Sequence, residues 1–298
     1  MTLPDNAELV KRLTTHVDRL AGLIGPRHPG NPRMLNAAAT YIETELRLLG
    51  DDVRHETYAV SDGIVANLIV ERPGTSRPGE IVIVGAHYDT LPQSPGADDN
   101  ASAVAMLIEV ARLLQGGRAA RTLRLIAFTC EEPPYFHLGQ MGSQEHARGC
   151  RARGERVVAM LSLEMVGYYT DAPGSQRLPP GIPRGLRWAF PSRGNFLAAV
   201  ANPRSWRVLW TFRRGFKRAS RFPLFTVALP ERIQEIRRSD NSSFWDQGYP
   251  ALMITDTSFL RNANYHEATD TPDTLDYVRM AEATRGVAGG VARLCGMR

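Results

Sequence analysis

The hydrophobic pattern of the first third of the chain predicts two helices, a hairpin and a buried strand. Apolar side chains recur at helical spacing in residues 9–24 and 35–49, which indicates two amphipathic helices. Residues 53–60 and 64–71 have the pattern of two hairpin strands joined by a tight turn. The continuous apolar run within residues 80–89 is typical of a strand that is buried on both faces.

The remaining pattern predicts alternating strands and helices. We expect strands at residues 122–130, 157–167 and 251–257, a short helix near Gln144, and helices at 101–114 and 278–294. This alternation favours a single α/β domain over residues 1–298, with three α/β/α layers and a mixed, mostly parallel sheet of about eight strands. We interpret residues 172–230, which are rich in Arg and Pro, as an irregular cap inserted in that domain.

Composition narrows the class of protein. The 298 residues are 43% hydrophobic and 22% charged, which is ordinary for a globular enzyme and excludes general disorder. No apolar run approaches the roughly 20 residues needed to span a bilayer, and the first residues lack the pattern of a signal peptide. Three scattered cysteines exclude a disulfide framework or a Cys-type zinc site. We therefore expect a cytoplasmic protein.

The positive net charge of the chain is local. Residues 172–230 contain eleven Arg or Lys and no acidic residue, which leaves 25 basic against 31 acidic residues elsewhere. A solvated cap over the site is the favoured interpretation, and a cationic surface for carboxylate-bearing substrates is the second. A nucleic-acid surface is a third, but the sequence contains no recognised nucleic-acid motif. We expect neither a nucleic-acid nor a membrane partner.

Polar residues that can perform chemistry lie near the ends of the predicted strands or in the loops that follow them. Ligands of such sheets gather at the carboxyl ends of the strands, and the residues found there are His87, Asp89, Asp98, Asp99, Glu131, Glu132, Glu164 and His266. So many carboxylates would repel one another, and two divalent cations would balance three of them together with one hydroxide. Nitrogen and carboxylate donors suit catalytic zinc. Asp98, Asp99 and Asn100 have an alternative use as helix caps, whereas an unpaired Glu164 inside an apolar strand would be costly.

Six motifs carry a resemblance to a known family. They occur in order within residues 35–295: HYD (87–89), GADDNASAVAMLIEVARLL (96–114), CEEPP (130–134), SLEMVGYY (162–169), SDNSSFWDQGYPALMITDT (239–257) and YHEATDTPDTL (265–275). Together they resemble the zinc aminopeptidases of peptidase family M28. That family includes bacterial leucyl and Streptomyces-type aminopeptidases, glutamate carboxypeptidase II and the glutaminyl cyclases.

The resemblance implies a role for each site residue. It implies that one zinc ion is held by His87, Asp98 and Glu164, and a second by Asp98, Glu132 and His266, so that Asp98 bridges the two. It also implies that Glu131 is the general base for a metal-bridged hydroxide and that Tyr265 steadies the oxyanion. Asp89 is expected to accept a hydrogen bond from the second ring nitrogen of His87. Cobalt or manganese in place of zinc, and supporting or turn roles for Asp240, Asp270 and Asp273, stay open.

The implied activity is removal of N-terminal residues from peptide substrates. Two alternatives stay open: a glutaminyl cyclase that uses a single zinc ion, and a non-catalytic binding protein on the same scaffold. A metal count per chain would separate the first alternative from the two-metal peptidase. Tyr135 and Phe136 follow Glu132 closely, so we expect them in the wall of an apolar substrate pocket. We expect the arginines of residues 185–221 to serve the carboxylate side of short peptides.

Overall fold

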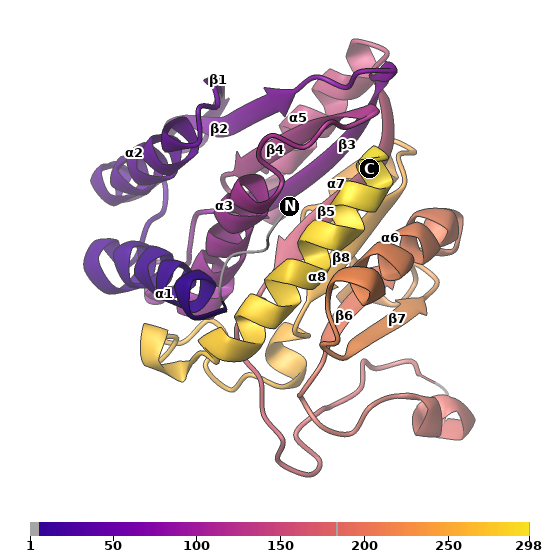
Figure 1. Ribbon diagram of the computed structural model, residues 1–298. Coiled ribbons are helices and arrows are strands. Elements are labelled where there is room, and N and C mark those ends of the chain that lie inside the picture. The colour runs from indigo at the N-terminus through magenta and orange to yellow at the C-terminus, as the bar shows by residue number, and fades with distance from the viewer. Residues whose placement is uncertain (1–5, 183, 298) are drawn as a thin grey trace.

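Eight β-strands form one mixed sheet in the structure, a computed structural model that describes residues 6–182 and 184–297. The strands are β1 (Val53–Val60), β2 (Gly63–Arg72), β3 (Arg77–His87), β4 (Arg121–Phe128), β5 (Arg156–Glu164), β6 (Leu197–Ala201), β7 (Leu224–Ala228) and β8 (Ala251–Thr255). Their order across the sheet is β1-β2-β4-β3-β5-β8-β6-β7 (Figure 1). The central strands β4, β3, β5 and β8 are parallel, and antiparallel pairs flank them on both sides. This confirms the predicted sheet.

Helices cover both faces of this sheet. The α-helices are α1 (Asn6–Val17), α2 (Pro32–Leu48), α3 (Ala103–Leu113), α4 (Tyr135–Leu138), α5 (Gly142–Ala152), α6 (Trp206–Ala219), α7 (Asn241–Asp246) and α8 (Tyr277–Cys295). Figure 1 shows α1, α3, α6 and α8 in front of the sheet, where α8 contacts the other three, while α5 and α7 contact each other behind it. The structure therefore has the three layers that the sequence predicted.

The central strands are buried on both faces because each side of the sheet has its own core. In β3, Val82 and Val84 belong to the core beneath α3 and α8, whereas Ile81 and Ile83 belong to the core beneath α5 and α7. Successive side chains of a strand point to opposite faces, so both sets must be apolar. This arrangement explains the continuous apolar run that predicted the strand.

Residues 172–230 differ from the predicted irregular cap. This segment contributes β6, α6 and β7 to the fold, and only its first part is a long loop. Phe212 and Phe216 on α6 are fully buried, one helical turn apart. Gly215 lies so close to α8 that a Cβ atom there would be 2.4 Å from the carbonyl oxygen of Gly289. The many arginines lie on the exposed face of α6, and their number hides its apolar stripe in the sequence.

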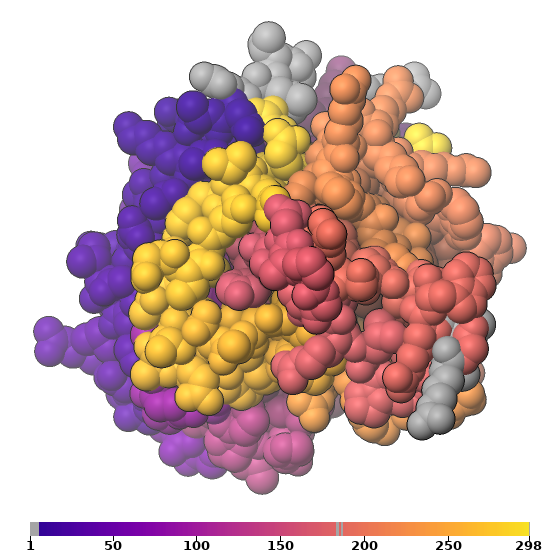
Figure 2. Space-filling model, turned by 90° about the horizontal axis from the view of Figure 1, so that it is seen from below, coloured from indigo at the N-terminus to yellow at the C-terminus, as the bar shows by residue number. Residues whose placement is uncertain are grey.

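Two loops cover the edge where the central parallel strands end. The segment after β5 and the segment after β8 lie side by side on this face, joined by a hydrogen bond from the Arg177 backbone N–H to the Leu260 carbonyl. Figure 2 looks onto this edge, with the first segment in rose and the second in gold. Among the described residues, no helix combines the length and the apolar character required to cross a membrane.

Candidate metal centre

Asp99 lies between His87, the last residue of β3, and His266, which stands in the loop after β8. Its Oδ1 atom is 3.4 Å from His87 Nε2, and its Oδ2 atom is 3.3 Å from His266 Nε2. Glu164 Oε2 lies 3.4 Å from His87 Nε2, and Glu132 Oε2 lies 3.2 Å from His266 Nε2. The residues therefore form two groups of three donors, and Asp99 supplies one oxygen to each.

The spacing of these donors fits zinc. Zinc binds nitrogen and oxygen at about 2.0–2.2 Å in tetrahedral geometry, which separates two ligand atoms by about 3.3–3.5 Å. The four donor pairs lie at 3.2–3.4 Å, close to that separation. Each group has two carboxylates and one imidazole, and three protein ligands leave a position open for water or substrate, as in catalytic zinc sites. The donor set therefore fits two divalent cations with Asp99 between them.

Asp98, which the resemblance implied as the bridging ligand, is in neither group. Its carboxylate accepts hydrogen bonds from the Gly167 backbone N–H at 2.9 Å and from Asn262 Nδ2 at 2.8 Å, and it is fully buried. The pKa of Asp98 is raised well above its usual value by burial and by the neighbouring Asp256 carboxylate. Adjacent residues project in different directions, so only one of the two aspartates faces the histidines. The bridging assignment moves from Asp98 to Asp99.

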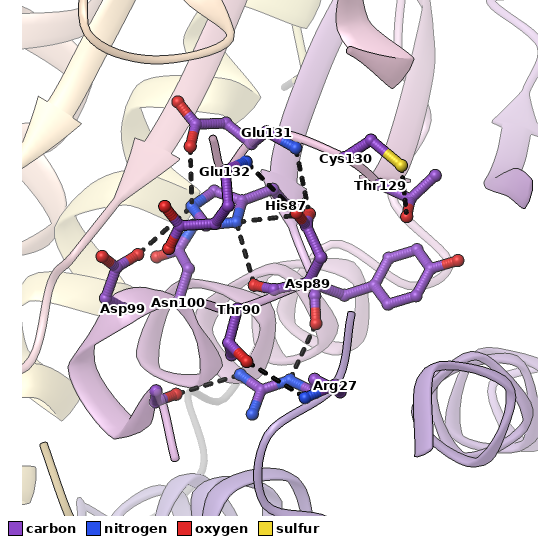
Figure 3. A network of polar contacts seen from close by, with 12 residues as sticks. Arg27, His87, Asp89, Thr90, Asp99, Asn100, Thr129, Cys130, Glu131 and Glu132 are labelled. Atoms are coloured by element: carbon purple, nitrogen blue, oxygen red, sulfur yellow. Dashed lines mark hydrogen bonds and ion pairs between the residues drawn. The ribbon is translucent and has the colours of Figure 1, made fainter. Parts of the chain in front are cut away.

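Asp89 is the partner of the second ring nitrogen of His87, as expected, but mainly through its backbone carbonyl group. The Nδ1 atom of His87 lies 3.2 Å from the backbone carbonyl oxygen of Asp89, while the Asp89 carboxylate is 3.6 Å away. That carboxylate instead accepts hydrogen bonds from the backbone N–H groups of Glu131 and Glu132, at 3.1 and 3.2 Å (Figure 3). Asp89 therefore fixes both glutamates and the tautomer of His87 through separate atoms.

Glu131 lies beside the two donor groups without belonging to either. Its Oε2 atom is 4.0 Å from His87 Nε2, and the residue lines the same cavity as Asp99 and Glu132. The strand β4 ends at Phe128, so both glutamates stand in the loop that precedes Pro133. This break lets the adjacent glutamates serve one site, which a regular strand would not allow.

Two buried residues hold the loop that carries Asp99. Asp270 accepts hydrogen bonds from the backbone N–H groups of Asp98 and Asp99 at 2.9 and 3.0 Å. The fully buried Arg27 donates to the carbonyl oxygens of Tyr88 and Gly96 at 2.7 and 2.9 Å, and so links this loop to the end of β3 (Figure 3). The site is therefore held mainly through backbone groups.

The sequence left the roles of the other supporting residues open or gave no sign of them. Ser239 donates to Glu164 Oε2 at 2.7 Å, and Asn100 ties its own loop to β5 by donating to the carbonyl oxygen of Leu163 at 3.0 Å. Asp240 is fully buried next to Ser239, whereas Asp273 is exposed in a short turn. Ser239 lies inside one of the six motifs, but Arg27 precedes all of them, and no sequence signal marked it.

The donor side chains lie close enough together to change one another's pKa values. Burial opposes protonation of His266, but the carboxylates of Asp99 and Glu132 outweigh it and raise its pKa to about 10. Burial and the Asp99 charge raise the pKa of Glu132 to about 7, although His266 acts in the opposite direction. Burial also raises the pKa of Glu131 well above its usual value. Imidazole must be neutral to bind a metal, so cation binding here releases protons.

Four of the five donors, Asp99, Glu132, Glu164 and His266, line the inner end of a cavity of about 670 Å³. Tyr265 lies in its wall, with its ring stacked on that of His266 at a centroid distance of 3.7 Å. Phe136 also lines the cavity, as expected, but Tyr135 does not: its hydroxyl donates to Asp62 at 2.5 Å. Phe136 is therefore the part of the predicted pocket wall that the structure retains.

The arginines of residues 185–221 are not in this wall, contrary to expectation. Among the described residues, the arginines that line the cavity are Arg177, Arg237 and Arg238. The 185–221 segment instead contributes apolar residues such as Phe190 and Phe196. The arginines of α6 extend from its exposed face because its buried face packs on α8.

Comparisons with known proteins agree with this fold. An uncharacterized Escherichia coli K12 protein, YfbL, is 36% identical over 286 residues, which cover 93% of this chain and 86% of that protein. Leucine aminopeptidase 1 of Trichophyton equinum is 28% identical over 256 residues, or 81% of this chain, which spans about 60% of the fungal protein's length. The structure of a zinc aminopeptidase from Bacillus subtilis superposes with a TM-score of 0.76 at 15% identity, covering 97% and 95% of the two chains.

A glutaminyl cyclase has the same fold. The enzyme from Fimbriiglobus ruber superposes with a TM-score of 0.67 at 18% identity, covering 98% of this chain and 96% of the cyclase. At such identities the structural likenesses show the fold alone. The sequence itself matches the model of peptidase family M28 over residues 67–291. The chain therefore belongs to peptidase family M28.

Proposed function

We propose that this chain is an aminopeptidase that uses two zinc ions to hydrolyse the N-terminal peptide bond of its substrates. The observation that carries the proposal is the position of Asp99, whose two oxygens each face a different histidine. A single-metal site needs only one of these two donor groups. Two complete groups that share one carboxylate are the arrangement expected of a two-metal hydrolase.

Each group of donors would hold one ion. His87, Asp99 and Glu164 would bind the first, and Asp99, Glu132 and His266 the second. When bound, two such ions would lower the pKa of a water molecule and polarise the carbonyl group of the substrate. Three carboxylates leave one positive charge on the pair of ions for an attacking oxygen anion to neutralise. Cobalt or manganese would satisfy the same donors.

Glu131 would move the proton. Its carboxylate faces the cavity from beside the donor groups and belongs to neither. In this position Glu131 Oε2 can take a proton from the attacking water and give it to the nitrogen of the leaving amine. The hydrogen bond from its backbone N–H to Asp89 Oδ1 fixes the residue at the edge of the site. Glu131 can transfer this proton only while its carboxylate stays at the edge of the site.

Tyr265 would donate to the oxygen of the scissile carbonyl. Burial, together with the charges of Asp99 and Glu132, raises the pKa of its phenol, so the hydroxyl remains protonated. The ring is fixed against His266. A donor held there in advance stabilises the negative charge that develops on the carbonyl oxygen in the transition state.

A glutaminyl cyclase with a single zinc ion is the alternative function, because a known glutaminyl cyclase has the same fold. The cyclase reaction releases ammonia from an N-terminal glutamine and leaves the peptide chain uncut. The two functions therefore predict different products from a glutaminyl peptide. The two donor groups favour hydrolysis.

The test is hydrolysis of leucine p-nitroanilide by zinc-reconstituted protein, compared with its Glu131→Gln variant. We expect turnover to fall about 10²–10⁴-fold or more in the variant because the base is lost. Zinc content should stay at the parent level because Glu131 is in neither donor group. Glu145→Gln, which removes the same charge from an exposed ion pair on α5, is the matched control and should change neither quantity.

Two results would overturn the proposal. One is release of ammonia and a cyclised product from a glutaminyl peptide by a protein that does not cut leucine p-nitroanilide. The other is an unchanged turnover number in Glu131→Gln. Loss of zinc together with activity in that variant would instead make Glu131 a ligand.

A further inference from the structure

Two arginines contact the same residue at the outer end of the cavity. Arg177 Nη2 donates to the backbone carbonyl oxygen of Phe259, and the Arg238 guanidinium carbon lies 5.1 Å from the centroid of the Phe259 ring. All three residues line the cavity, and both arginines are exposed. Two positive charges are thereby gathered around one residue in the cavity wall.

Arg177 and Arg238 differ from Arg237, the third arginine of the cavity wall, because they have no acidic partner among the described residues. Arg237 is paired with Glu231 and Asp246. In the part of the chain that the structure describes, no carboxylate oxygen lies within 4 Å of a guanidinium nitrogen of Arg177 or Arg238. Glu235 lines the same cavity and forms no ion pair with either of them.

Arg238 is tied to the metal centre by two separate connections. The next residue, Ser239, donates to Glu164 Oε2 at 2.7 Å. In addition, the Phe259 ring beneath the guanidinium group lies 5.7 Å from the ring of Tyr265, which is stacked on His266. The backbone next to Arg238 and the ring on which its guanidinium group lies are therefore both anchored to the site where the peptide bond would be cut.

We propose that Arg177 and Arg238 bind the C-terminal carboxylate of short peptides whose N-terminal residue lies at the metal centre. This inference rests on the proposed function. Arginine is the side chain best suited to a carboxylate because its planar group offers parallel N–H donors and is always charged. The apolar wall between the two ends, with Phe136 and Phe196, suits the side chains of the substrate. The substrate class is thus short apolar peptides with a free C-terminus.

The test compares substrates that differ only in the terminal carboxylate. KM and kcat are measured for Leu-Gly, Leu-Gly-Gly and their C-terminal amides, with leucine p-nitroanilide as a substrate that has no carboxylate. We expect Arg177→Gln and Arg238→Gln each to raise KM for the free acids about tenfold, which is the lower range for a charged hydrogen bond because both side chains are exposed. The amides and the anilide should be unaffected, and kcat should stay within twofold. Added salt should weaken the preference for the free acids.

Arg214→Gln is the matched control. It removes the same charge from the exposed face of α6, outside the cavity, and should change no substrate's KM. Equal effects of Arg238→Gln on the free acid and the amide would overturn the proposal, since the residue would then only support the wall. An arginine-dependent preference for Leu-Glu-amide over Leu-Gly-amide, without one for free Leu-Gly, would also overturn it, because the site would then read acidic side chains.

A binding measurement separates this inference from the proposed function. Zinc-loaded Glu131→Gln is titrated calorimetrically with Leu-Gly and with Leu-Gly-amide. Tighter binding of the free acid that disappears in the Glu131→Gln, Arg238→Gln double variant supports the carboxylate site even where the parent cuts neither peptide. Hydrolysis of the anilide by the parent, with no difference between acid and amide in binding, leaves the proposed function standing and rejects the carboxylate site.

Discussion

The cavity has an inner end with the carboxylates around His87 and His266, and an outer end with Arg177 and Arg238 around Phe259. The inner side chains are nearly all buried, and their orientation depends on hydrogen bonds that the backbone of their own loops donates to the buried carboxylates of Asp89 and Asp270. The outer pair is exposed and depends on one carbonyl oxygen and one aromatic ring. The two ends are thus supported by different kinds of contact.

This difference reflects the different requirements of catalysis and of substrate recognition. A metal centre must place five side chains to within a fraction of an ångström, which buried backbone contacts achieve. Recognition of a substrate's far end adds affinity and tolerates mobile, exposed groups. Changes at the inner end should therefore remove activity, whereas changes at the outer end should alter the preference among substrates.

After Glu131→Gln, the largest effect that sharpens this comparison is expected at Tyr265. Tyr265→Phe keeps the ring on His266 and removes only the hydroxyl, so it should lower kcat with little change in KM. Loss of one oxyanion donor costs about 2.7–4 kcal/mol, or about 10²–10³ in rate. Steady-state kinetics with leucine p-nitroanilide measures both constants. An unchanged kcat would place Tyr265 outside the mechanism.

The inner end should also make the stability of the metal-free protein depend on pH. The pKa values of Glu132 and His266 are raised to about 7 and about 10, so the folded state binds more protons than the unfolded state above about pH 4.5. Stability should therefore fall as pH rises from about 4.5 to about 10, by several kcal/mol, and the Tm should fall with it.

Differential scanning fluorimetry of protein treated with a chelator measures this fall. Saturating zinc should abolish it, because the ions replace the protons as partners of the carboxylates. A Tm of the chelator-treated protein that rises steadily over the same range would contradict the charge cluster described here.

The smallest effect is expected in the apolar wall between the two ends. Phe136→Ala should raise KM for leucyl substrates about three- to tenfold more than for alanyl substrates, because a larger side chain loses more apolar contact. Tyr135→Phe is the control, since its hydroxyl bonds Asp62 outside the cavity. Equal losses for both substrates would show that the loop is structural and that the pocket lies elsewhere.

The sequence predicted most residues at the inner end of the cavity but few of those at the outer end. His87 and Glu164 lie at the ends of predicted strands and Glu132 just after one, so the topology alone brings them together. Arg238 and Phe259 meet only because two loops fold over the same edge, and loops carry no periodicity. The strands β6 and β7 have five residues each and lie in an Arg-rich segment, which hid them and α6.

Asp98 and Asp99 show most clearly what could not be predicted from the sequence. The motif contains both, and no pattern of composition or spacing decides which carboxylate faces the histidines. The structure separates them by their partners: Asp99 faces His87 and His266, while Asp98 lies beside Asp256 and accepts from Gly167. Burial and the neighbouring Asp256 carboxylate raise the pKa of Asp98, which distinguishes it further from Asp99.

The most direct test of the two-metal site is the zinc content of Asp99→Asn and Asp98→Asn, measured by mass spectrometry after dialysis of folded protein. The parent and Asp98→Asn should each retain two ions per chain, because Asp98 contacts neither donor group. Asp99→Asn should retain less than one, because both groups lose the ligand that they share. Two ions in Asp99→Asn, or loss of both ions only in Asp98→Asn, would contradict the account.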